Sequence, residues 1–386
     1  MQLTRTTSTG LATLGALLLA ACPSSSRADL LGMESEDQNA QYLFRFFADA
    51  DRVHVVSHYG FYDVALENDV DVSVHVNHEA VTIPAVEAPP GSDDAIDAVT
   101  TASRPIQGAD AFEDFTKVRN EVQAAAAYRG LDLGYYVSTE SDYFAQQAAV
   151  EYSLKMDREN LVLTGGVSYG WDRIEPLQDA DTSTPDDHRN TTHGHFVVTR
   201  VLTPTTLLRV GAEMNKVEGL QHNPYRNVYA GGGPEPELHP DERLRRDLFV
   251  RVNQYVSNGS SVKLAYRYYA DDWGIDSHEM GAKLHQHVGE WVDVRYRYRY
   301  YRQTAADFYR AEYETADGID GYRTGDYRMR DMTSHLFGSR LDLDLGVFAL
   351  QSRWLSSFEI GFGYERYFND ANFSANVFES GLHFEF

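Results

Sequence analysis

The 386-residue chain has one cysteine and no apolar run of the roughly 20 residues that a membrane-spanning helix requires. The single cysteine excludes a disulfide scaffold and a zinc cluster built from thiolates. Positive charge is scarce, because 34 Lys and Arg stand against 58 Asp and Glu and leave a formal charge of −24. This balance argues against a nucleic-acid partner, which normally requires a basic stripe. What remains is an acidic chain rich in Tyr (25), Phe (19) and Gly (29).

The first 28 residues have the features of a cleaved signal peptide. Arg5 is the only charge before an apolar segment, residues 11–21, which has the length of a signal-peptide core and is too short to span a bilayer. Two processing sites compete. Residues 26–28 fit cleavage before Asp29, whereas Cys22 ends a lipobox-like segment and would be acylated. Either site predicts export, with residues 29–40 as a periplasmic segment ahead of the folded part.

From residue 41 to the end, apolar and polar residues alternate. In residues 292–300 the even positions hold valine and tyrosine, and the odd positions hold aspartate and three arginines. Successive side chains of a strand point to opposite faces, so this segment has one apolar-aromatic face and one charged face. The same pattern recurs at residues 70–77, 208–215 and 262–268. Repeated alternating segments of about ten residues are typical of a transmembrane antiparallel β-barrel, apolar toward lipid and polar toward the lumen.

The connections support an up-and-down barrel, because short and long links alternate. Outer-membrane barrels have short periplasmic turns and longer external loops. We expect long loops at residues 82–111, 173–191, 217–242 and 304–328. About 16 strands are predicted, with 14 as the alternative. Their ranges are 41–49, 52–66, 70–81, 118–129, 131–138, 143–156, 160–172, 192–202, 206–216, 245–256, 261–270, 275–288, 291–303, 332–346, 357–367 and 374–386.

The last strand carries a further signal. Phe384 and the terminal Phe386 share a face with other apolar residues, opposite polar positions. A final strand that ends on Phe resembles the signal read by the barrel-assembly machinery of the outer membrane. We therefore expect that machinery as a partner and expect Phe384 and Phe386 to serve as the assembly signal.

Several motifs resemble a known family. They are YRYYADDWGIDSH at 266–278, YRYYRQ at 298–303, AADFYR at 305–310, DAVTTASR at 97–104 and NPY at 223–225. Together they are similar to the bacterial domain-of-unknown-function 3570 family of outer-membrane barrels, over nearly the whole mature chain. The family has no assigned activity and supplies no catalytic residues. The resemblance implies a link to envelope redox chemistry, with periplasmic redox proteins as partners. The histidine-rich segments around residues 188–195 and 285–287 do not match its pattern.

Inward-facing charges are the candidate functional residues. A basic ladder would lie on one side of the lumen and carboxylates across from it: Arg267, Arg295, Arg297 and Arg299 against Asp71, Glu79, Glu279 and Asp293. Charged side chains set selectivity in pores, and an arginine ladder favours anions. The alternative is that these residues pair and fill a closed lumen, since a buried charge without a partner is costly.

Other site chemistry finds less support in the sequence. His285 and His287 share one strand face, where two imidazoles can hold one ion. Lys283 on that face repels cations and no third ligand is evident, so we predict no metal site and no cofactor. The acidic loops lack the spacing of a dedicated calcium site. His335 neighbours Ser334 but faces the opposite way on a strand, so we predict no enzyme.

Residues 82–111 differ from the other loops. They contain four prolines and no strand alternation, and unstructured loops of this length are usually functional. One hypothesis places residues 97–105 in the barrel mouth as a plug, with Asp97 and Arg104 facing the lumen. The alternative is a disordered external loop.

The sequence thus predicts an all-β chain whose residues 41–386 form a barrel in the outer membrane of a Gram-negative bacterium, in contact with lipid and lipopolysaccharide. The predicted function is a channel or transport component for small polar or anionic solutes. A structural or adhesive barrel and an outer-membrane hydrolase are the alternatives.

Overall fold

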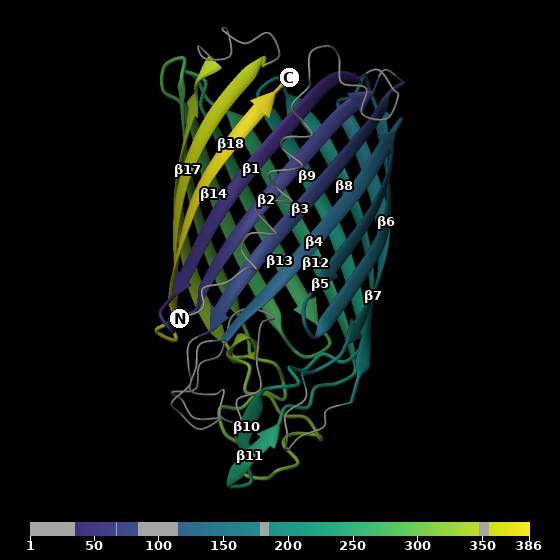
Figure 1. Ribbon diagram of the computed structural model, residues 1–386, viewed down its shortest axis with the longest axis vertical. Helices are drawn as coiled ribbons and strands as arrows, with labels where there is room; N and C mark the ends of the chain where they lie inside the picture. Colours follow the sequence, from purple (N-terminus) through teal and green to yellow (C-terminus); the bar gives the residue numbers. More distant parts are fainter. Residues whose placement is uncertain (1–34, 67, 84–114, 178–184, 347–354) are drawn as a thin grey trace, which may run out of the picture.

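The computed structural model describes residues 35–66, 68–83, 115–177, 185–346 and 355–386 as one closed barrel with a folded extension at one end (Figure 1). Sixteen antiparallel strands pair in sequence order, and the barrel closes where β18 (Ser374–Glu385) pairs with β1 (Ser35–Asp49). Within these ranges no helix is long and apolar enough to cross a bilayer. The other barrel strands are β2 (His54–Leu66), β3 (Val70–Ile83), β4 (Phe115–Tyr128), β5 (Leu131–Thr139), β6 (Tyr143–Met156), β7 (Leu161–Ile174), β8 (Asp187–Thr203), β9 (Thr206–Gly219), β12 (Glu242–Tyr255), β13 (Ser261–Asp271), β14 (Asp276–His287), β15 (Val292–Gln303), β16 (Met332–Asp344) and β17 (Ser357–Asn369).

Each of the sixteen predicted strands is present, so the count of sixteen is confirmed and fourteen is wrong. The predicted ends are less accurate. β1 begins at Ser35 rather than at residue 41, so part of the expected periplasmic segment belongs to the barrel, and β8 begins at Asp187 rather than at residue 192. The reason is that backbone pairing continues where side-chain alternation stops; Asp187, for example, still pairs with Ile174.

A separate two-stranded sheet lies outside the barrel and was not predicted. It consists of β10 (Asn227–Ala230) and β11 (Gly233–Pro236), within the loop expected at residues 217–242. Both strands are short and β11 contains two prolines. Proline is typical of loops and strand edges, so the sequence pattern predicts a loop here. The turn between them consists of Gly231 and Gly232, both with positive φ.

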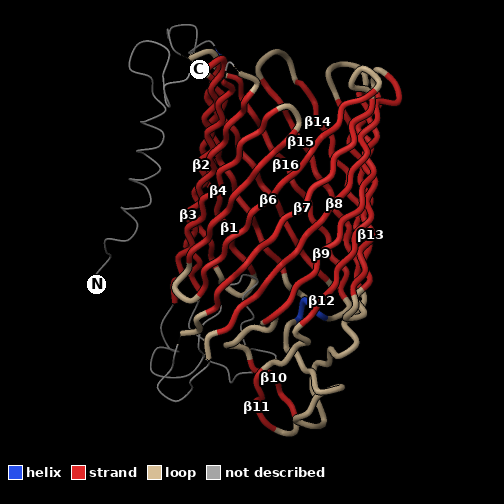
Figure 2. Tube along the Cα trace, turned by 90° about the vertical axis from the view of Figure 1, so that its right-hand side faces the viewer, coloured by secondary structure: helices blue, strands red, loops and turns tan. Residues whose placement is uncertain are grey.

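The two ends of the barrel differ, and Figures 1 and 2 show all of β10 and β11 at one of them. We call this end the long-loop rim; the links there include residues 220–241 and 304–331. The opposite end, the short-turn rim, has links as short as residues 129–130 and 204–205 and also holds the C-terminus. The predicted alternation of short and long links holds only in part. Four links at the long-loop rim are as short as turns, residues 50–53, 140–142, 272–275 and 370–373, and β16 and β17 are separated by residues 345–356.

Large apolar side chains cover the outer face of the barrel. On four different strands Leu133 is 53% exposed, Val167 58%, Leu248 59% and Phe337 51%. Tyr296 lies on the same face, as the alternation in β15 predicts. A soluble protein rarely exposes so large an apolar surface, whereas a transmembrane barrel needs one against the lipid chains. The inner face of each strand therefore carries the polar residues.

Candidate functional site

Two loops at the long-loop rim, residues 220–241 and 304–331, fold together into a unit that we call the cap (Figure 2). Leu238 and Arg323 exchange two backbone hydrogen bonds of 2.9 Å. Gly231 N donates to Tyr313 O at 3.0 Å, and the buried Tyr313 hydroxyl donates to Phe308 O at 2.7 Å. The bonds of Leu238 and Gly231 join segments that are about 80 residues apart in sequence, and the Tyr313 hydroxyl bond lies within the second segment. The cap is therefore a small folded unit and not two independent loops.

A buried carboxylate, Glu237, links the two halves of the cap. It accepts hydrogen bonds of 2.8 Å from Thr324 Oγ1 and from Gly325 N, and Arg226 Nη1 lies 3.4 Å away. Burial raises the pKa of the Glu237 carboxyl, and the charge of Arg226 opposes that rise. Asn223 N also donates to Glu237 at 3.4 Å. A buried carboxylate held in this way stabilises the cap only while its partners are in place, because removing one leaves charge or polarity unsatisfied.

Asp326 makes a second buried ionic contact in the cap. Its carboxylate lies 2.6 Å from Arg328 Nη2 and 3.2 Å from Arg226 Nη1. Although burial opposes ionisation, hydrogen bonds from Arg328 and the charge of Arg226 hold the pKa of Asp326 below its ordinary value. The carboxylate thus remains charged at neutral pH.

The cap rests on an aromatic cluster at the mouth of the barrel. The buried Trp273 ring, from the turn between β13 and β14, meets the rings of Phe308 and His239 with centroids 5.3 Å away in each case. Burial lowers the pKa of His239 from 6.5 to about 3, and His222 beside it, 6.0 Å between centroids, is shifted in the same direction. At neutral pH His239 therefore packs as a neutral ring.

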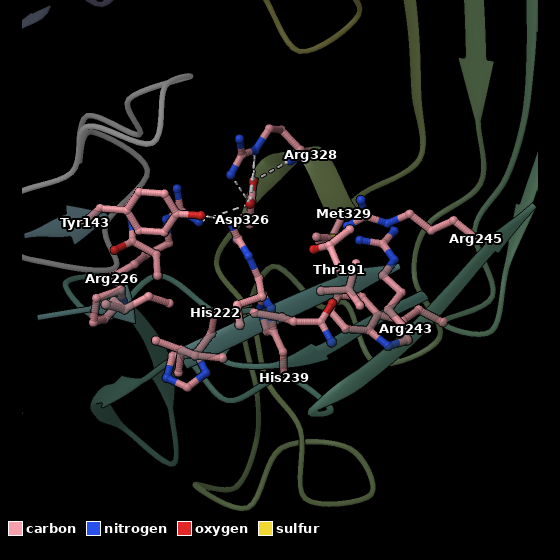
Figure 3. A pocket seen from close by; sticks show the side chains of 18 of the residues that line it. Tyr143, Thr191, His222, Arg226, His239, Arg243, Arg245, Asp326, Arg328 and Met329 are labelled. Carbon is pink, nitrogen blue, oxygen red and sulfur yellow. Dashed lines mark hydrogen bonds and ion pairs between the residues drawn. The ribbon is translucent and has the colours of Figure 1, made fainter. Parts of the chain in front are cut away.

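A cavity of about 550 Å³ lies between the cap and the inner wall of the barrel (Figure 3). This volume lies within the range of small-molecule binding pockets. Six cationic and three anionic side chains line it: Lys117, Arg189, Arg226, Arg243, Arg245 and Arg328, with Glu140, Asp142 and Asp326. The cavity is thus polar, with an excess of positive charge.

Arg245 is the lining cation that lacks an ion-pair partner among the described residues. Ion pairs hold the other five: Lys117 to Glu140 and Asp142, Arg189 to Asp172, Arg226 to Glu237 and Asp326, Arg243 to Asp271, and Arg328 to Asp326. Arg245 Nε is buried without a hydrogen bond, and so is Oδ1 of Asn215, its cross-strand neighbour on β9. Unsatisfied buried polar atoms are uncommon in folded proteins, so the Arg245 and Asn215 side chains are incompletely satisfied by the described residues.

Inside the barrel, the four predicted arginines lie on the inner face and each has a carboxylate partner. Arg267 Nε lies 2.5 Å from Asp247, Arg295 3.1 Å from Asp342, Arg297 2.9 Å from Glu365 and Arg299 3.8 Å from Glu279. The prediction that Glu279 and Asp293 face these arginines from across the lumen is wrong. Both lie on the same wall, on β14 and β15, because neighbouring strands place them beside the arginines.

Three cations on adjacent strands that the sequence analysis did not select have no ion-pair partner among the described residues, and neither has Arg209 on β9, the exposed cross-strand neighbour of Arg251. Arg251 on β12, Lys263 on β13 and Lys283 on β14 are exposed, although they lie on the inner face. Lys263 and Lys283 are direct cross-strand neighbours, and Lys283 neighbours Arg297 on the other side. Exposure of inward side chains means that water reaches this half of the lumen. Their alternation pattern was visible in the sequence, but their lack of partners required the register.

Carboxylates lie on the opposite wall, at the short-turn half of the lumen. Asp63 on β2, Asp71 on β3 and Asp132 on β5 line a second cavity that has no lysine or arginine among its lining residues. In the barrel order these strands are about half a circumference from β13. Asp71 was predicted to lie across from the basic wall, and it does. Glu79 also lies on β3, but nearer the long-loop rim, and its Oε1 atom is 3.0 Å from Arg119 Nη2.

Ser334, His335 and Phe384, which the sequence analysis also considered, lie on the last strands of the barrel. Ser334 is buried on the inner face of β16, whereas His335 stacks with Tyr298 on the outer face, so the two do not form a nucleophile–base pair. Phe384 stacks on Phe358 with ring centroids 5.0 Å apart, and its role with Phe386 in assembly stays a prediction. Other predictions lie outside the described residues: the signal peptide, Cys22, and the plug residues Asp97 and Arg104.

A family model described as "Protein of unknown function (DUF3570)" matches residues 11–376, nearly the whole chain. No curated protein matches the chain. Among solved structures, OmpT of Vibrio cholerae is 9% identical, with 91% of this chain and 98% of that chain covered and a TM-score of 0.44. OpdK of Pseudomonas aeruginosa with vanillate is 9% identical, with 91% and 98% covered and a TM-score of 0.43. OccK3 of the same organism is 9% identical, with 91% and 95% covered and a TM-score of 0.41.

The architecture fixes the location of the protein. The barrel is closed, antiparallel and even in strand number, and apolar residues form its outer face. A closed barrel leaves no unpaired strand edge in the hydrocarbon region, where an unpaired edge would be costly. These are the properties of barrels in the outer membrane of Gram-negative bacteria. The protein is therefore an outer-membrane barrel in contact with lipid.

Proposed function

The chain belongs to the DUF3570 family, and from its own residues we propose that it is an outer-membrane channel for small polar and anionic solutes. Solutes enter through the cavity beneath the cap, where Arg245 offers an unpaired positive charge. They then pass the exposed cations of the inner wall. In this proposal the long-loop rim faces the outside of the cell and the short-turn rim faces the periplasm.

One observation carries the proposal: the exposed, unpaired row of Arg251, Lys263 and Lys283 on adjacent strands. A barrel that used its charges only for packing would pair them, as it does for Arg297 and Glu365. Solvated cations on one wall, with Asp71 and neighbouring carboxylates on the other, create a transverse field in the water-filled part of the lumen. Such a field favours solutes whose negative group follows the basic wall.

The paired arginines have a different role in this proposal. Arg295 and Arg299 pair with carboxylates on the neighbouring strands and Arg297 pairs with Glu365 two strands away, so each pair cancels most of its own field and holds the wall in register. The sequence-based choice of Arg295, Arg297 and Arg299 as selectivity residues is therefore replaced by the unpaired row. Anion preference depends on Arg251, Lys263 and Lys283, while the pairs contribute stability.

Single-channel recording in planar bilayers under a salt gradient tests the proposal. We expect the wild-type reversal potential to indicate anion preference. The triple variant R251Q/K263Q/K283Q should move it toward cations and still fold. The matched control R295Q/R297Q/R299Q should shift it less and lower the unfolding temperature more. Folded wild-type protein that does not conduct would contradict the channel and favour a structural or adhesive barrel that displays its cap. A conducting unpaired-row variant with unchanged selectivity would contradict the assignment of that row.

A further inference from the structure

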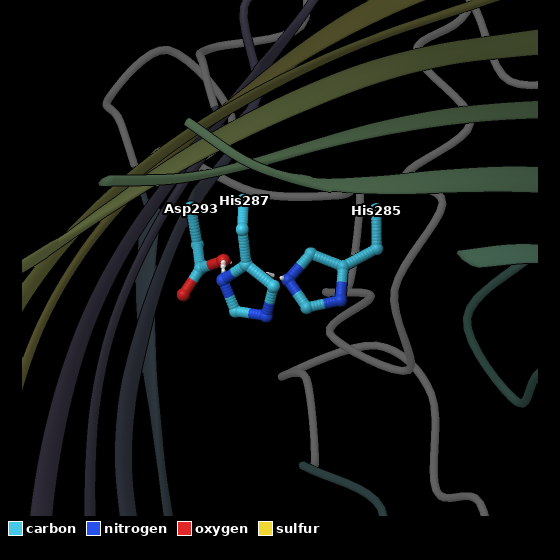
Figure 4. A group of neighbouring side chains, drawn as sticks. All are labelled: His285, His287 and Asp293. Atoms are coloured by element: carbon cyan, nitrogen blue, oxygen red, sulfur yellow. Dashed lines mark hydrogen bonds and ion pairs between the residues drawn. The ribbon is translucent and has the colours of Figure 1, made fainter. Parts of the chain in front are cut away.

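Two histidines and one aspartate converge on the inner wall near the short-turn rim (Figure 4). His285 and His287 lie two residues apart on β14, and Asp293 projects beside them from β15, as the figure shows. His285 Nε2 is 3.1 Å from Asp293 Oδ1, and His287 Nδ1 approaches the same oxygen even more closely. The sequence offered two ligands and no third; strand register supplies the third, because His287 pairs directly with Asp293.

We propose that His285, His287 and Asp293 bind a divalent transition-metal cation, with Zn²⁺ as the ion that best fits them. Two neutral imidazoles and one carboxylate form the ligand set of many three-residue zinc sites, which leave a further position open. Imidazole nitrogen favours Zn²⁺, Cu²⁺ and Ni²⁺ over Ca²⁺ and Mg²⁺, which prefer oxygen ligands. The site goes beyond the proposed channel function and does not depend on it.

The geometry needs only a small adjustment to hold the ion. The three ligand atoms already lie within 4.8 Å of one another. Zinc–nitrogen and zinc–oxygen distances of about 2.0–2.2 Å place tetrahedral ligand atoms roughly 3.3 Å apart. The His285 nitrogen already lies 3.1 Å from the Asp293 oxygen, so the closer His287 nitrogen is the one that must move away from that oxygen to reach the spacing. All three side chains are partly exposed, so an ion in the lumen can reach them.

Neighbouring residues support the arrangement. Gly259 lies behind His287, and a Cβ at position 259 would lie 3.0 Å from the Cδ2 atom of that ring. The turn that contains Gly259 therefore leaves just enough room for the imidazole. Arg295, the cross-strand neighbour of His285, is directed to Asp342 at 3.1 Å, and Asp342 also accepts from Arg340 at 2.7 Å. This carboxylate keeps guanidinium charge away from the three ligands.

A second histidine pair on the inner wall provides a matched control. His193 and His195 are also two residues apart, on β8. Their nearest carboxylates belong to two different strands, with His195 2.8 Å from Glu151 and His193 3.9 Å from Glu213. Each of these histidines thus has its own carboxylate, whereas His285 and His287 share one. The variant H193A/H195A removes the same number of imidazole rings from the lumen and leaves the proposed ligands in place.

Zn²⁺ binding to the full, untagged protein, purified in detergent and stripped with a chelator, tests the proposal by calorimetry. We expect one saturable site per barrel and no comparable heat with Ca²⁺ or Mg²⁺. H285A/H287A should weaken binding about 100-fold or more, since even the loss of an outer-sphere partner costs 10–100-fold. D293N should weaken it too, and H193A/H195A should leave it unchanged. Cu²⁺ paramagnetic resonance should show coordination by two imidazole nitrogens, which H285A/H287A removes.

Two results would overturn the site. One is folded wild-type protein with no saturable Zn²⁺ binding. The other is binding that survives in H285A/H287A or disappears in H193A/H195A. The heat-modifiable band on gels shows whether each variant is folded, and D293N is the milder change if the double variant fails to fold. Since binding is measured without conductance, failure of the metal site leaves the channel proposal standing, and the reverse also holds.

Discussion

The two halves of the lumen differ in whether their charged side chains are buried in ion pairs or exposed to water. At the long-loop half, ions are buried in pairs: the Arg243 and Asp271 side chains are 8% and 0% exposed, and the Lys117 and Asp142 side chains are 4% and 6% exposed. At the short-turn half, Lys263 and Lys283 are exposed and unpaired among the described residues. Yet the strands of both halves are the same strands, with the same alternation.

This difference shows that strand alternation determines whether a side chain faces the lumen or the lipid. The surrounding packing determines whether a charged side chain is paired or exposed to water. Where the cap buries side chains, an unpaired charge is costly, and among the described residues every cation that lines the cavity except Arg245 has an ion-pair partner. Where water fills the lumen, a charge needs no partner and remains free to act on a solute. In the channel that we propose, the capped half would select solutes and the open half would supply the electrostatic field.

The largest expected effect concerns which half faces outward. Epitope tags in residues 217–242 or 304–328 should be labelled on intact cells, whereas a tag at Asn258-Gly259-Ser260 should be labelled only after the outer membrane is permeabilised. The physical reason is that outer-membrane barrels keep their short turns in the periplasm. Heat-modifiability confirms that each tagged protein is folded. Labelling of the 258–260 tag on intact cells would reverse the orientation.

Two arginines on one strand compare the halves directly. Arg243 and Arg251 both lie on the inner face of β12 and both cover an aromatic ring, Trp273 at 4.2 Å and Phe249 at 4.6 Å. R243M leaves Asp271 buried and unpaired, which should lower the free energy of unfolding by about 3–5 kcal/mol. R251M removes a solvated charge and should cost about 1 kcal/mol or less. Urea unfolding in detergent measures both, and equal losses would contradict the distinction between the halves.

The sequence sufficed for the strands because their signals are local. Period-two alternation and turn residues such as Asn258 and Gly259, both with positive φ, fix each hairpin without reference to distant parts. Such local signals do not predict the cap. Its hydrogen bonds join residues such as Leu238 and Arg323, and no alternation marks segments that pack on each other irregularly.

The sequence predicted which charged side chains face the lumen, but not which residues they pair with. Alternation placed Arg297 and His285 on the inner face, and both lie there. That Arg297 meets Glu365, 68 residues away, follows only from the register across three strands. The third ligand beside the histidines was within reach, because the short turn near Gly289 sets the register that pairs His287 with Asp293.

A smaller effect is expected from unlatching the cap. E237A removes the acceptor for Thr324 and Gly325 and should weaken closure of the cap by about 2–3 kcal/mol, the cost of leaving buried donors unsatisfied. Hydrogen exchange should rise in residues 220–241 and 304–331 and not in the barrel strands. The control E235A alters an exposed carboxylate 3.9 Å from Arg323 and should change nothing measurable. Exchange that rises equally in both variants would show that Glu237 does not link the cap.

The smallest effect is a pH dependence of the same cap. Burial lowers the pKa of His239 from 6.5 to about 3, so the closed cap holds a neutral ring while an opened cap takes up a proton. Stability from this group is complete above pH 6.5 and is lost as the pH falls below 6.5, by about 2 kcal/mol at pH 5. His222 acts in the same direction, whereas Glu237, whose pKa is raised, acts in the opposite one. Exchange in the cap should therefore be faster at pH 5 than at pH 7.5, and H239F should remove most of that difference because its ring does not titrate. An undiminished acid response in H239F would assign the sensitivity to another group, such as His222 in the same cap.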